Sequence, residues 1–264
     1  MNSFHLKRLK PCCSWVLLLI TLSLFAGCST APVRHGELIE PVYPADRLVK
    51  EDIVTLDVYD PWEGLNRHIY NFNYSFDKYV FLPVVNVYDF ITVDFVQDRI
   101  TNFFLNLGEI RNFINSALQV KGNATATTAG RFVVNSTIGI LGLFDPATSM
   151  NMFRVNEDFG QTLGHYGLGS GPYMVLPIFG PSSLRDTTGL VVDTVANVLI
   201  TNEIIDQLDM RDSREDLLRY GLTALNAINT RHRTQFRYYG TGSPFEYELV
   251  RLLYNTKREL DIAK

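Results

Sequence analysis

The chain has 264 residues, of which 46% are apolar, and a formal net charge of −4 at pH 7. This apolar content is sufficient to bury a substantial core. The acidic balance argues against a nucleic-acid partner, because such binding depends on positive charge. It also argues against polybasic attraction to anionic lipid, so any membrane association has to come from acyl chains and apolar surface.

The N-terminus has the pattern of a secretion signal. Three basic residues precede an apolar run over residues 15–26, which ends in FAGC at positions 25–28. This run is shorter than the roughly 20 apolar residues of a membrane-spanning helix, and small residues follow it as at a cleavage site. The thiol directly after them resembles the lipobox of bacterial lipoproteins, although a Phe stands where Leu is usual. We therefore predict that residues 1–27 are removed and that Cys28 carries the lipid anchor, palmitate included.

Cleavage at this point fixes several other properties. The two remaining cysteines lie in the removed segment, so none is left for a disulfide or a metal. Removing three basic residues and no acidic one changes the formal charge from −4 to −7. Ser29 rather than Asp follows Cys28, which by resemblance to bacterial lipoproteins indicates the periplasmic face of the outer membrane. Residues 28–58 lack helical periodicity and are predicted to be a tether, which leaves 59–264 as one folded domain.

The first strongly predicted helix begins near Asp60. Asp60 is placed as N-cap, with Pro61 at the first helical position and Glu63 completing a capping box. An apolar face follows at steps of three and four. Beside it runs a polar row made of Asn66, Tyr70, Asn73 and Asp77. Two interpretations of this row stay open: a surface stripe or amide contact with another element, or the polar lining of a passage whose outside is apolar.

The spacing predicts further helices along the chain. Residues 84–118 form one long helix or two stacked end to end, restarted at Pro83, with Gly108 as a candidate kink. Asn123 is placed to cap a helix over about 124–135. Further apolar or amphipathic helices are expected over 190–200, from residue 213 onward, and after the cap-like sequence SPFE at 243–246.

Between the predicted helices lies a run of seven residues without a polar side chain, IGILGLF at 138–144. It is too short to cross a bilayer. A buried strand or core loop and a hairpin tip that dips into one leaflet are both compatible with this pattern.

The segment from Phe159 to Arg185 contains six glycines and three prolines among apolar residues. Glycine and proline on this scale are incompatible with a long regular helix or ladder, so we expect a shaped loop held by tertiary contacts. An apolar loop of this length is buried in protein, lines a ligand, or lies against lipid.

Candidate catalytic groups are sparse. Ser170 lies among glycines without a strand-to-helix context, and Pro172 disfavours the helix that should follow a nucleophile. His165 with Asp158 or Glu157 would supply two thirds of a triad, a combination that arises by chance in most chains of this size. Histidines at metal-ligand spacing and a framed dinucleotide motif are absent. We therefore predict no catalytic residue, no metal and no cofactor.

Three blocks of residues resemble the MlaA (VacJ) lipoproteins of Gram-negative outer membranes. They are DPWEGLNR at 60–67 with YNFN at 70–73; GRF at 130–132 with NS at 135–136, Gly139, Gly142 and LFDP at 143–146; and FGQTLGHYG at 159–167 with GPY at 171–173 and LRD at 184–186. The blocks span about residues 60–186, and the third is the most specific. Beyond about Ser213 the similarity lies mainly in the helical pattern.

The resemblance implies a mostly α-helical fold, a single multi-helix, ring-like, membrane-associated domain with a long Gly/Pro-rich loop. It implies partners as well: the outer membrane, trimeric porins, phospholipid and a soluble periplasmic lipid carrier. Family members pass mislocalised outer-leaflet phospholipid to that carrier without covalent chemistry and so maintain lipid asymmetry. Two alternatives are retained: a structural porin-associated lipoprotein, and a lipid hydrolase motivated by His165 and Ser170.

On this basis we predict which residues handle lipid. The phospholipid passage is assigned to Asn66, Tyr70 and Asn73. Contact with the membrane is assigned to Ile138, Ile140, Leu141, Leu143 and Phe144. The segment 159–185 is interpreted as a rigid apolar wall of the conduit, with an internal packing loop as its alternative.

Overall fold

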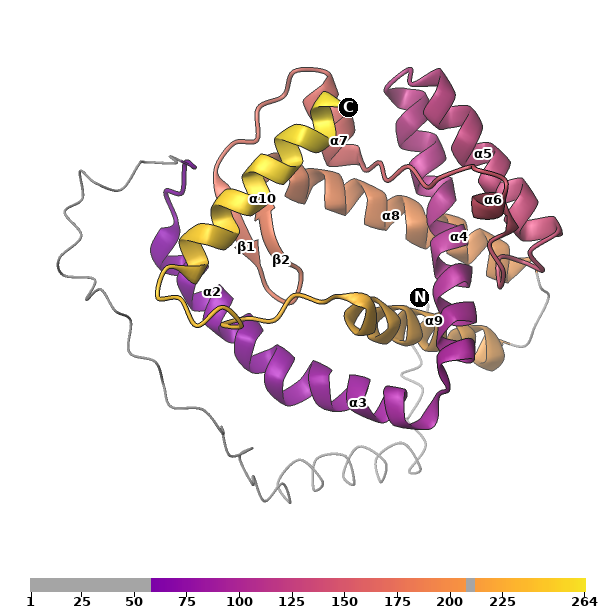
Figure 1. Cartoon of the computed structure of the whole chain (residues 1–264), viewed down its shortest axis with the longest axis horizontal. Helices are drawn as coiled ribbons and strands as arrows, with labels where there is room; N and C mark the ends of the chain where they lie inside the picture. The colour runs from indigo at the N-terminus through magenta and orange to yellow at the C-terminus, as the bar shows by residue number, and fades with distance from the viewer. Residues whose placement is uncertain (1–57, 208–211) are drawn as a thin grey trace, which may run out of the picture. The chain divides into compact units, whose positions relative to one another are not determined.

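The computed structural model describes residues 58–207 and 212–264 (Figure 1). Cys28, the signal peptide and the tether before residue 58 lie outside these ranges. The elements are mostly helices: α2 (Glu63–Phe76), π-helical η2 (Asp77–Phe81), α3 (Leu82–Ile91), α4 (Asp94–Leu118), α5 (Gly122–Thr137), α6 (Pro146–Ser149), α7 (Phe159–His165), α8 (Leu184–Asp206), α9 (Asp212–Arg233) and α10 (Glu246–Ala263). Two short strands, β1 (Tyr173–Leu176) and β2 (Gly180–Ser183), form an antiparallel hairpin. The predicted mostly α-helical fold is confirmed.

The packing of the elements closes into a circuit within residues 58–264. α3 packs on α9, α9 on α8, α8 on β2, and β1 on α2, which leads back to α3. Figure 1 shows α4 and α5 side by side as an antiparallel pair, and α4 also contacts α7 and α9. This circuit agrees with the ring-like arrangement that the family resemblance implies.

Two expectations about the first helices are corrected. The helical chain is continuous from α2 through η2 to α3. Pro83 does not restart the helix. The turn before it is the wider π-helical turn η2, and this change in the hydrogen-bonding pattern accommodates proline, which has no backbone N–H to donate. Asp60 does not cap α2 either. The helix begins at Glu63, and the Asp60 carboxylate accepts hydrogen bonds from Asn66, Tyr247 and Arg251 instead. Asp60 therefore joins α2 to α10.

The long helix predicted over 84–118 is two helices that meet at an extended residue, Thr92. α4 then continues through Gly108 as one helix of 25 residues. Asn123 lies inside α5 rather than at its cap, since that helix begins at Gly122. The helix expected over 190–200 extends over the whole of α8, and Ser183 caps it by accepting from the Asp186 N–H at 3.1 Å.

The segment 159–185 holds more regular structure than predicted. Its first seven residues form α7, and its second half forms the hairpin of β1 and β2, so the expected irregular loop is wrong in part. No element in it is long, as its glycines and prolines indicated. Gly160 and Gly189 let α7 and α8 touch, because a Cβ on Gly189 would lie 2.2 Å from the Gly160 nitrogen.

Polar side chains occupy much of the interior, and apolar side chains occupy much of the surface. The apolar core is a small cluster of Tyr70, Tyr173, Val175 and Tyr247. Buried asparagines and ion-paired side chains make up much of the rest of the interior. Large apolar residues of α3, the 138–144 turn and α8 are exposed. The fold thus presents to its surroundings the kind of surface that soluble proteins bury.

Candidate functional site

The polar row of α2 is bound to the hairpin. Asn66 donates from Nδ2 to the Tyr173 carbonyl at 3.2 Å, and its Oδ1 accepts from the Val175 N–H at 2.9 Å. Two helical turns later, Asn73 donates to the Leu176 carbonyl at 2.9 Å and accepts from the Ile178 N–H at 2.7 Å. Asn66 pairs with the free edge of β1 as a neighbouring strand would, which protects that edge, and Asn73 holds the turn that follows β1.

Tyr70 lies between the two asparagines and faces the C-terminal part of the chain. Its hydroxyl donates to the Glu246 carboxylate at 2.8 Å, and burial together with this bond raises the Tyr70 pKa. Glu246 also accepts from the Thr241 N–H at 3.1 Å and from its hydroxyl at 2.6 Å. Edge-to-face contacts with Tyr238, Tyr239 and Tyr247 complete the packing of the ring.

The structure therefore brings Asn66, Tyr70 and Asn73 together but buries them, each with 2% or less of its surface exposed. Their polar atoms are engaged by the hairpin, Asp60 and Glu246, so the amide contact with another element is the interpretation that the geometry favours. A lining role for these three residues stays a prediction. The spacing of asparagines seven residues apart was the available signal for two amide contacts with one hairpin.

The turn at 138–144 is exposed and irregular. Ile138 and Leu141 are 63% and 72% exposed, and Ile140, Leu143 and Phe144 are exposed as well. The buried-strand interpretation is therefore wrong. Ile140 and Leu141 adopt left-handed backbone conformations, with φ of 52° and 56°. Gly139 is required here, because a Cβ at this position would lie 2.4 Å from the Asn135 carbonyl oxygen.

Backbone hydrogen bonding in this turn is internal. The N–H of Leu141 donates to the Ser136 carbonyl at 2.9 Å, that of Gly142 to Asn135 at 2.8 Å, and that of Phe144 to Gly139 at 2.9 Å. Since unsatisfied N–H groups are what exclude irregular backbone from a hydrocarbon environment, this turn is compatible with one.

The outer face of α8 is the second large apolar surface. Val191, Val195, Val198 and Leu199 are exposed along it, while Arg185, Asp186 and Asp193 point inward and are buried. Within the described ranges, α8 alone is long and apolar enough to cross a membrane by length and composition, which by itself is weak evidence for a span. The hairpin tip adds the exposed side chains of Ile178 and Phe179.

A buried ion cluster, which the sequence analysis did not predict, holds the 138–144 turn against α4 and α5. Arg131 donates from Nε to Glu109 at 2.7 Å and from Nη2 to Asp145 at 3.0 Å. Burial disfavours the charged form of Asp145, but bonds from Thr148, Arg131 and Asn135 outweigh it and lower the Asp145 pKa to about 2. Arg131 and Asp145 belong to the second family block, but their separation in sequence gave no sign that they pair.

A second cluster joins α10 to the starts of α7 and α8. Arg258 donates to Asp158 at 2.7 Å and to Asp186 at 2.9 Å, and the Tyr254 hydroxyl donates to Asp186 at 2.8 Å. Burial raises the pKa of both carboxyls, and the Arg258 bonds more than reverse this, so both lie below their ordinary value. The pair of Tyr254 and Arg258 on one helical face was the sequence signal that we did not use.

The residues considered for catalysis have other partners. Asp158 is held by Arg258, and the neighbouring Glu157 accepts from Gln119 at 2.9 Å and from Lys121 at 3.0 Å. His165 is exposed, and the Ser170 hydroxyl is 3.5 Å from the Gly171 carbonyl oxygen. In the part of the chain that the structure describes, no three His, Cys, Asp or Glu side chains are grouped so as to hold a metal ion. The prediction that the protein is not an enzyme stays a prediction.

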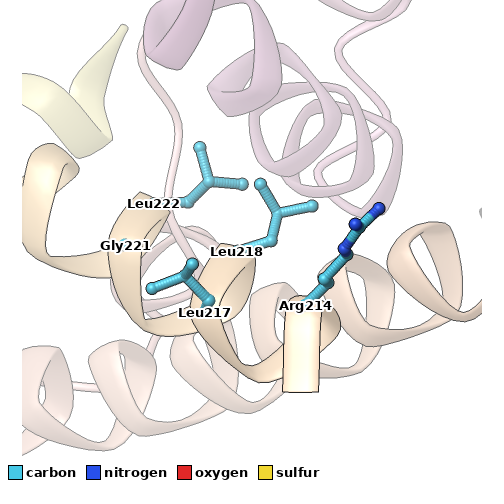
Figure 2. A pocket seen from close by; sticks show the side chains of 5 residues that line it. All are labelled: Arg214, Leu217, Leu218, Gly221 and Leu222. Atoms are coloured by element: carbon cyan, nitrogen blue, oxygen red, sulfur yellow. The ribbon is translucent and has the colours of Figure 1, made fainter. Parts of the chain in front are cut away.

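One cavity of about 330 Å³ lies along the first turns of α9 (Figure 2). Its lining comes from this helix alone and consists of Arg214, Leu217, Leu218, Gly221 and Leu222. Figure 2 shows these side chains along one stretch of the ribbon, without a polar group other than Arg214. This hollow is an apolar surface patch rather than a site with convergent polar groups.

Comparisons with known proteins give a consistent family. The family model described as "MlaA lipoprotein" matches residues 58–261. An uncharacterized protein of Rickettsia prowazekii (strain Madrid E) is 39% identical over 141 residues, which are 53% of this chain and 56% of the relative. The "Intermembrane phospholipid transport system lipoprotein MlaA" of Escherichia coli (strain K12) is 36% identical over 144 residues, 53% of this chain and 57% of the relative. The matches span little more than half of the length of these two relatives.

A solved structure is also similar to this chain. It bears the name "Structural basis for maintenance of bacterial outer membrane lipid asymmetry" and superposes with a TM-score of 0.60 at 29% sequence identity. The superposition covers 77% of this chain and 98% of the other. The helical circuit described above is therefore a fold that has been observed before.

Proposed function

The chain belongs to the MlaA lipoprotein family, and from that premise we propose that it is an outer-membrane lipoprotein of an intermembrane phospholipid transport system. In this role it removes mislocalised phospholipid from the outer leaflet and passes it to a soluble periplasmic carrier, which maintains lipid asymmetry. The observation that carries the proposal is the reversed distribution of polarity: apolar side chains of α3, the 138–144 turn and α8 are exposed around a polar interior. Such a body is suited to residence in lipid.

Two apolar surfaces are proposed to contact the bilayer. The 138–144 turn satisfies its backbone N–H groups internally while it exposes Ile138, Leu141 and Phe144, as an element in hydrocarbon has to do. α8 exposes one apolar face over residues 191–199 and buries the charged residues Arg185, Asp186 and Asp193, while Glu203 and Asp206 are exposed at its C-terminal end. Cys28, outside the described residues, is proposed to add covalent anchorage through its lipid on the periplasmic side.

The polar row of α2 is proposed to influence the lipid passage indirectly, because it positions the hairpin of β1 and β2. Asn66 and Asn73 fix the position of β1 and of the tip residues Ile178 and Phe179, which are exposed and apolar. A wall held at two points seven residues apart on one helix is rigid, and acyl chains can move along an apolar wall without loss of hydrogen bonds. The row therefore supports the passage by positioning one of its walls.

A reconstituted transfer assay tests this function. Vesicles that carry the lipidated protein with a trimeric porin and fluorescent phospholipid are mixed with the soluble carrier, and labelled lipid bound to the carrier is measured after separation. We expect transfer that depends on the protein and on Cys28, with Cys28→Ser as the variant that removes the anchor. Vesicles with porin alone are the control.

The assay also separates the alternatives. A structural lipoprotein that braces porins, for which the exposed apolar surface is equally suited, would co-purify with porin and leave the carrier empty. A lipid hydrolase would release labelled fatty acid or lysolipid, which thin-layer chromatography of the same samples would detect. Either result would contradict the transport function.

A further inference from the structure

α4 and α8 are separated by a groove that the polar row and the hairpin do not reach. The groove encloses about 120 Å³. Its apolar walls are Ile114, Leu118, Phe159, Val192, Ala196 and Ile200. The helices are joined by a buried hydrogen bond in which Asn115 donates to Asp193 at 3.1 Å. Ile114, Leu118 and Val192 are exposed, so the groove opens on the outer surface of the described fold.

Arg111 places a positive charge in this groove. Its Nε atom is buried and has no hydrogen-bond partner in the part of the chain that the structure describes. Asp193 also lines the groove, and Arg111 lies near enough to Asp193 and Asp158 to favour their charged forms. Neither carboxylate is hydrogen-bonded to Arg111, because Asp193 accepts from Asn115 and the Phe159 N–H and Asp158 accepts from Arg258. A partly buried guanidinium without a bonded counter-charge is costly unless an anion from outside the chain completes it.

The apolar walls continue onto the surface proposed to contact lipid. Val192 and Ala196 lie on α8 next to Val191 and Val195, which are exposed on its outer face. A molecule whose anion binds Arg111 therefore meets apolar side chains along the groove and beyond it. This combination fits an amphiphile with a charged head and a hydrocarbon tail, whereas a free ion would leave the walls unoccupied.

We propose that this groove binds one phospholipid molecule, with its phosphate on Arg111 and one acyl chain along the walls of α4 and α8. The inference rests on the proposed transport function and adds to it a holding site on the flank of the fold. The guanidinium supplies several N–H donors to phosphate oxygens, which is the contact that arginine makes best. The exposed amide of Asn197 is available to the head group.

The test compares two photoreactive probes in vesicles that carry the full-length lipidated protein. One probe is phosphatidylethanolamine with a diazirine in one acyl chain; the other is diacylglycerol with the same chain, which lacks the phosphate. After irradiation, mass spectrometry quantifies adducts on residues 111–118 and 192–200. We expect about tenfold more groove labelling by the phospholipid, the size of one charge-assisted contact.

Four variants assign that preference to the groove. Arg111→Gln should remove the preference for phospholipid, and Arg111→Lys should keep most of it because the charge remains. Ala196→Trp fills the space between the walls and should lower labelling by both probes. Arg214→Gln is the matched control, since Arg214 is an arginine beside the apolar patch of α9 and should leave groove labelling unchanged. Circular dichroism and thermal unfolding check that each variant is folded.

Three results would overturn the proposal. Equal labelling by both probes in the original protein would mean that no phosphate is recognised. A folded Arg111→Gln variant with the preference intact would exclude Arg111. If millimolar inorganic phosphate lowered labelling by the phospholipid probe to the level of the diacylglycerol probe, whose labelling stayed unchanged, the site would be one for a free anion.

Transfer to the carrier is measured on the same vesicles, so the two proposals fail separately. Groove labelling with the predicted preference but no transfer would support the groove and contradict the transport function. Transfer without groove labelling would support the transport function and overturn the groove.

Discussion

The interior and the outer surface of the described fold are built on opposite principles. Inside, Arg131 and Glu109 are fully buried and paired, and Asn66 clamps a strand edge. Outside, Phe90 is 90% exposed and Leu141 is 72% exposed. The same helices serve both regions: α2 buries Asn66 and Asn73 and exposes Leu65 and Phe72, and α8 buries Asp186 and Asp193 and exposes Val191 and Val195. Hydrogen bonds and ion pairs therefore specify how the elements fit together, and under the proposed function the surrounding lipid supplies the apolar contacts.

This difference predicts where substitutions act. A buried ion pair has little net value over an apolar replacement of both partners, but loss of one partner leaves the other charge buried alone. An exposed apolar side chain, in contrast, has few contacts within the chain to lose. Interior polar substitutions should therefore affect folding, and surface apolar substitutions should affect association with lipid.

The largest effect is expected for Arg131→Met. This change leaves Glu109, which has no exposed surface, with only Arg154 at 3.1 Å and Asn112 as partners. It also removes the bonds from Arg131 to Asp145, Thr148 and the Met152 carbonyl. We expect a loss of about 3–5 kcal/mol in the free energy of unfolding. Denaturant titration of the detergent-solubilised protein, followed by circular dichroism, measures it.

The matched control is Arg67→Met on α2. Arg67 also pairs with two carboxylates, Glu63 and Glu248, but its side chain is 37% exposed. An exposed pair contributes at most about 1 kcal/mol. Equal losses for the two arginine variants would mean that burial does not distinguish these ion pairs, and the contrast between interior and surface would be wrong.

A smaller effect is expected for Asn66→Leu and Asn73→Leu. Each change leaves a backbone N–H of the hairpin, that of Val175 or Ile178, without its acceptor. Each should lower the free energy of unfolding by about 1–3 kcal/mol. Faster amide hydrogen exchange at Val175 in the first variant and at Ile178 in the second would locate the loss in the hairpin.

Asn226→Leu, at an exposed position of α9, is the control and should change the unfolding free energy by less than about 0.5 kcal/mol. If the Asn66 and Asn73 variants were as stable as the control yet failed to preserve lipid asymmetry in cells, the passage-lining interpretation would replace the clamp.

The sequence predicted where the helices lie better than it predicted which side chains contact each other across them. Steps of three and four located α2, α4 and α8, because that periodicity is local. It also separated the row of Asn66, Tyr70 and Asn73 from the apolar face. It did not show that the row faces inward, because the usual assumption that the apolar face is the buried one fails for a protein with an apolar surface.

Long-range partners were the features that could not be predicted. Asp60 and Glu246 stand in sequences that match capping boxes, yet the distant hydroxyls of Tyr247 and Tyr70 donate to their carboxylates. Arg258 lies 100 residues from Asp158, and nothing local relates them. The exposed turn at 138–144 was one of two open interpretations, and the choice depended on surroundings that a single chain does not describe.

Acid should weaken the buried ion cluster of Arg131, Glu109 and Asp145, whereas the exposed apolar side chains carry no titratable group. The Asp145 pKa of about 2 lies below its ordinary value, so the folded state binds the proton less readily than the unfolded state. The stabilisation is therefore complete above about pH 4 and is lost as the pH falls towards 2. We expect a contribution of about 1 kcal/mol, because the carboxyl is partly exposed and solvent screens it.

Unfolding free energies measured between pH 6 and pH 2.5 check this, with Asp145→Asn as the comparison. The variant should be less stable at pH 6, and its deficit should shrink as the pH falls. A deficit that stays constant over this range would show that the charge of Asp145 is not what stabilises the turn.

The smallest effect on folding is expected on α8. Val195→Ser changes a side chain that is 52% exposed, and Val175→Ser makes the same change at 2% exposure. In detergent, the exposed change should alter the unfolding free energy by less than about 0.5 kcal/mol, and the buried one should lower it by about 1–3 kcal/mol. In a Cys28→Ser background that lacks the anchor, flotation with vesicles should fall for Val195→Ser and not for a folded Val175→Ser variant. A loss in detergent as large as that of Val175→Ser would mean that α8 packs against protein at Val195, and the outer surface would then follow the same principle as the interior.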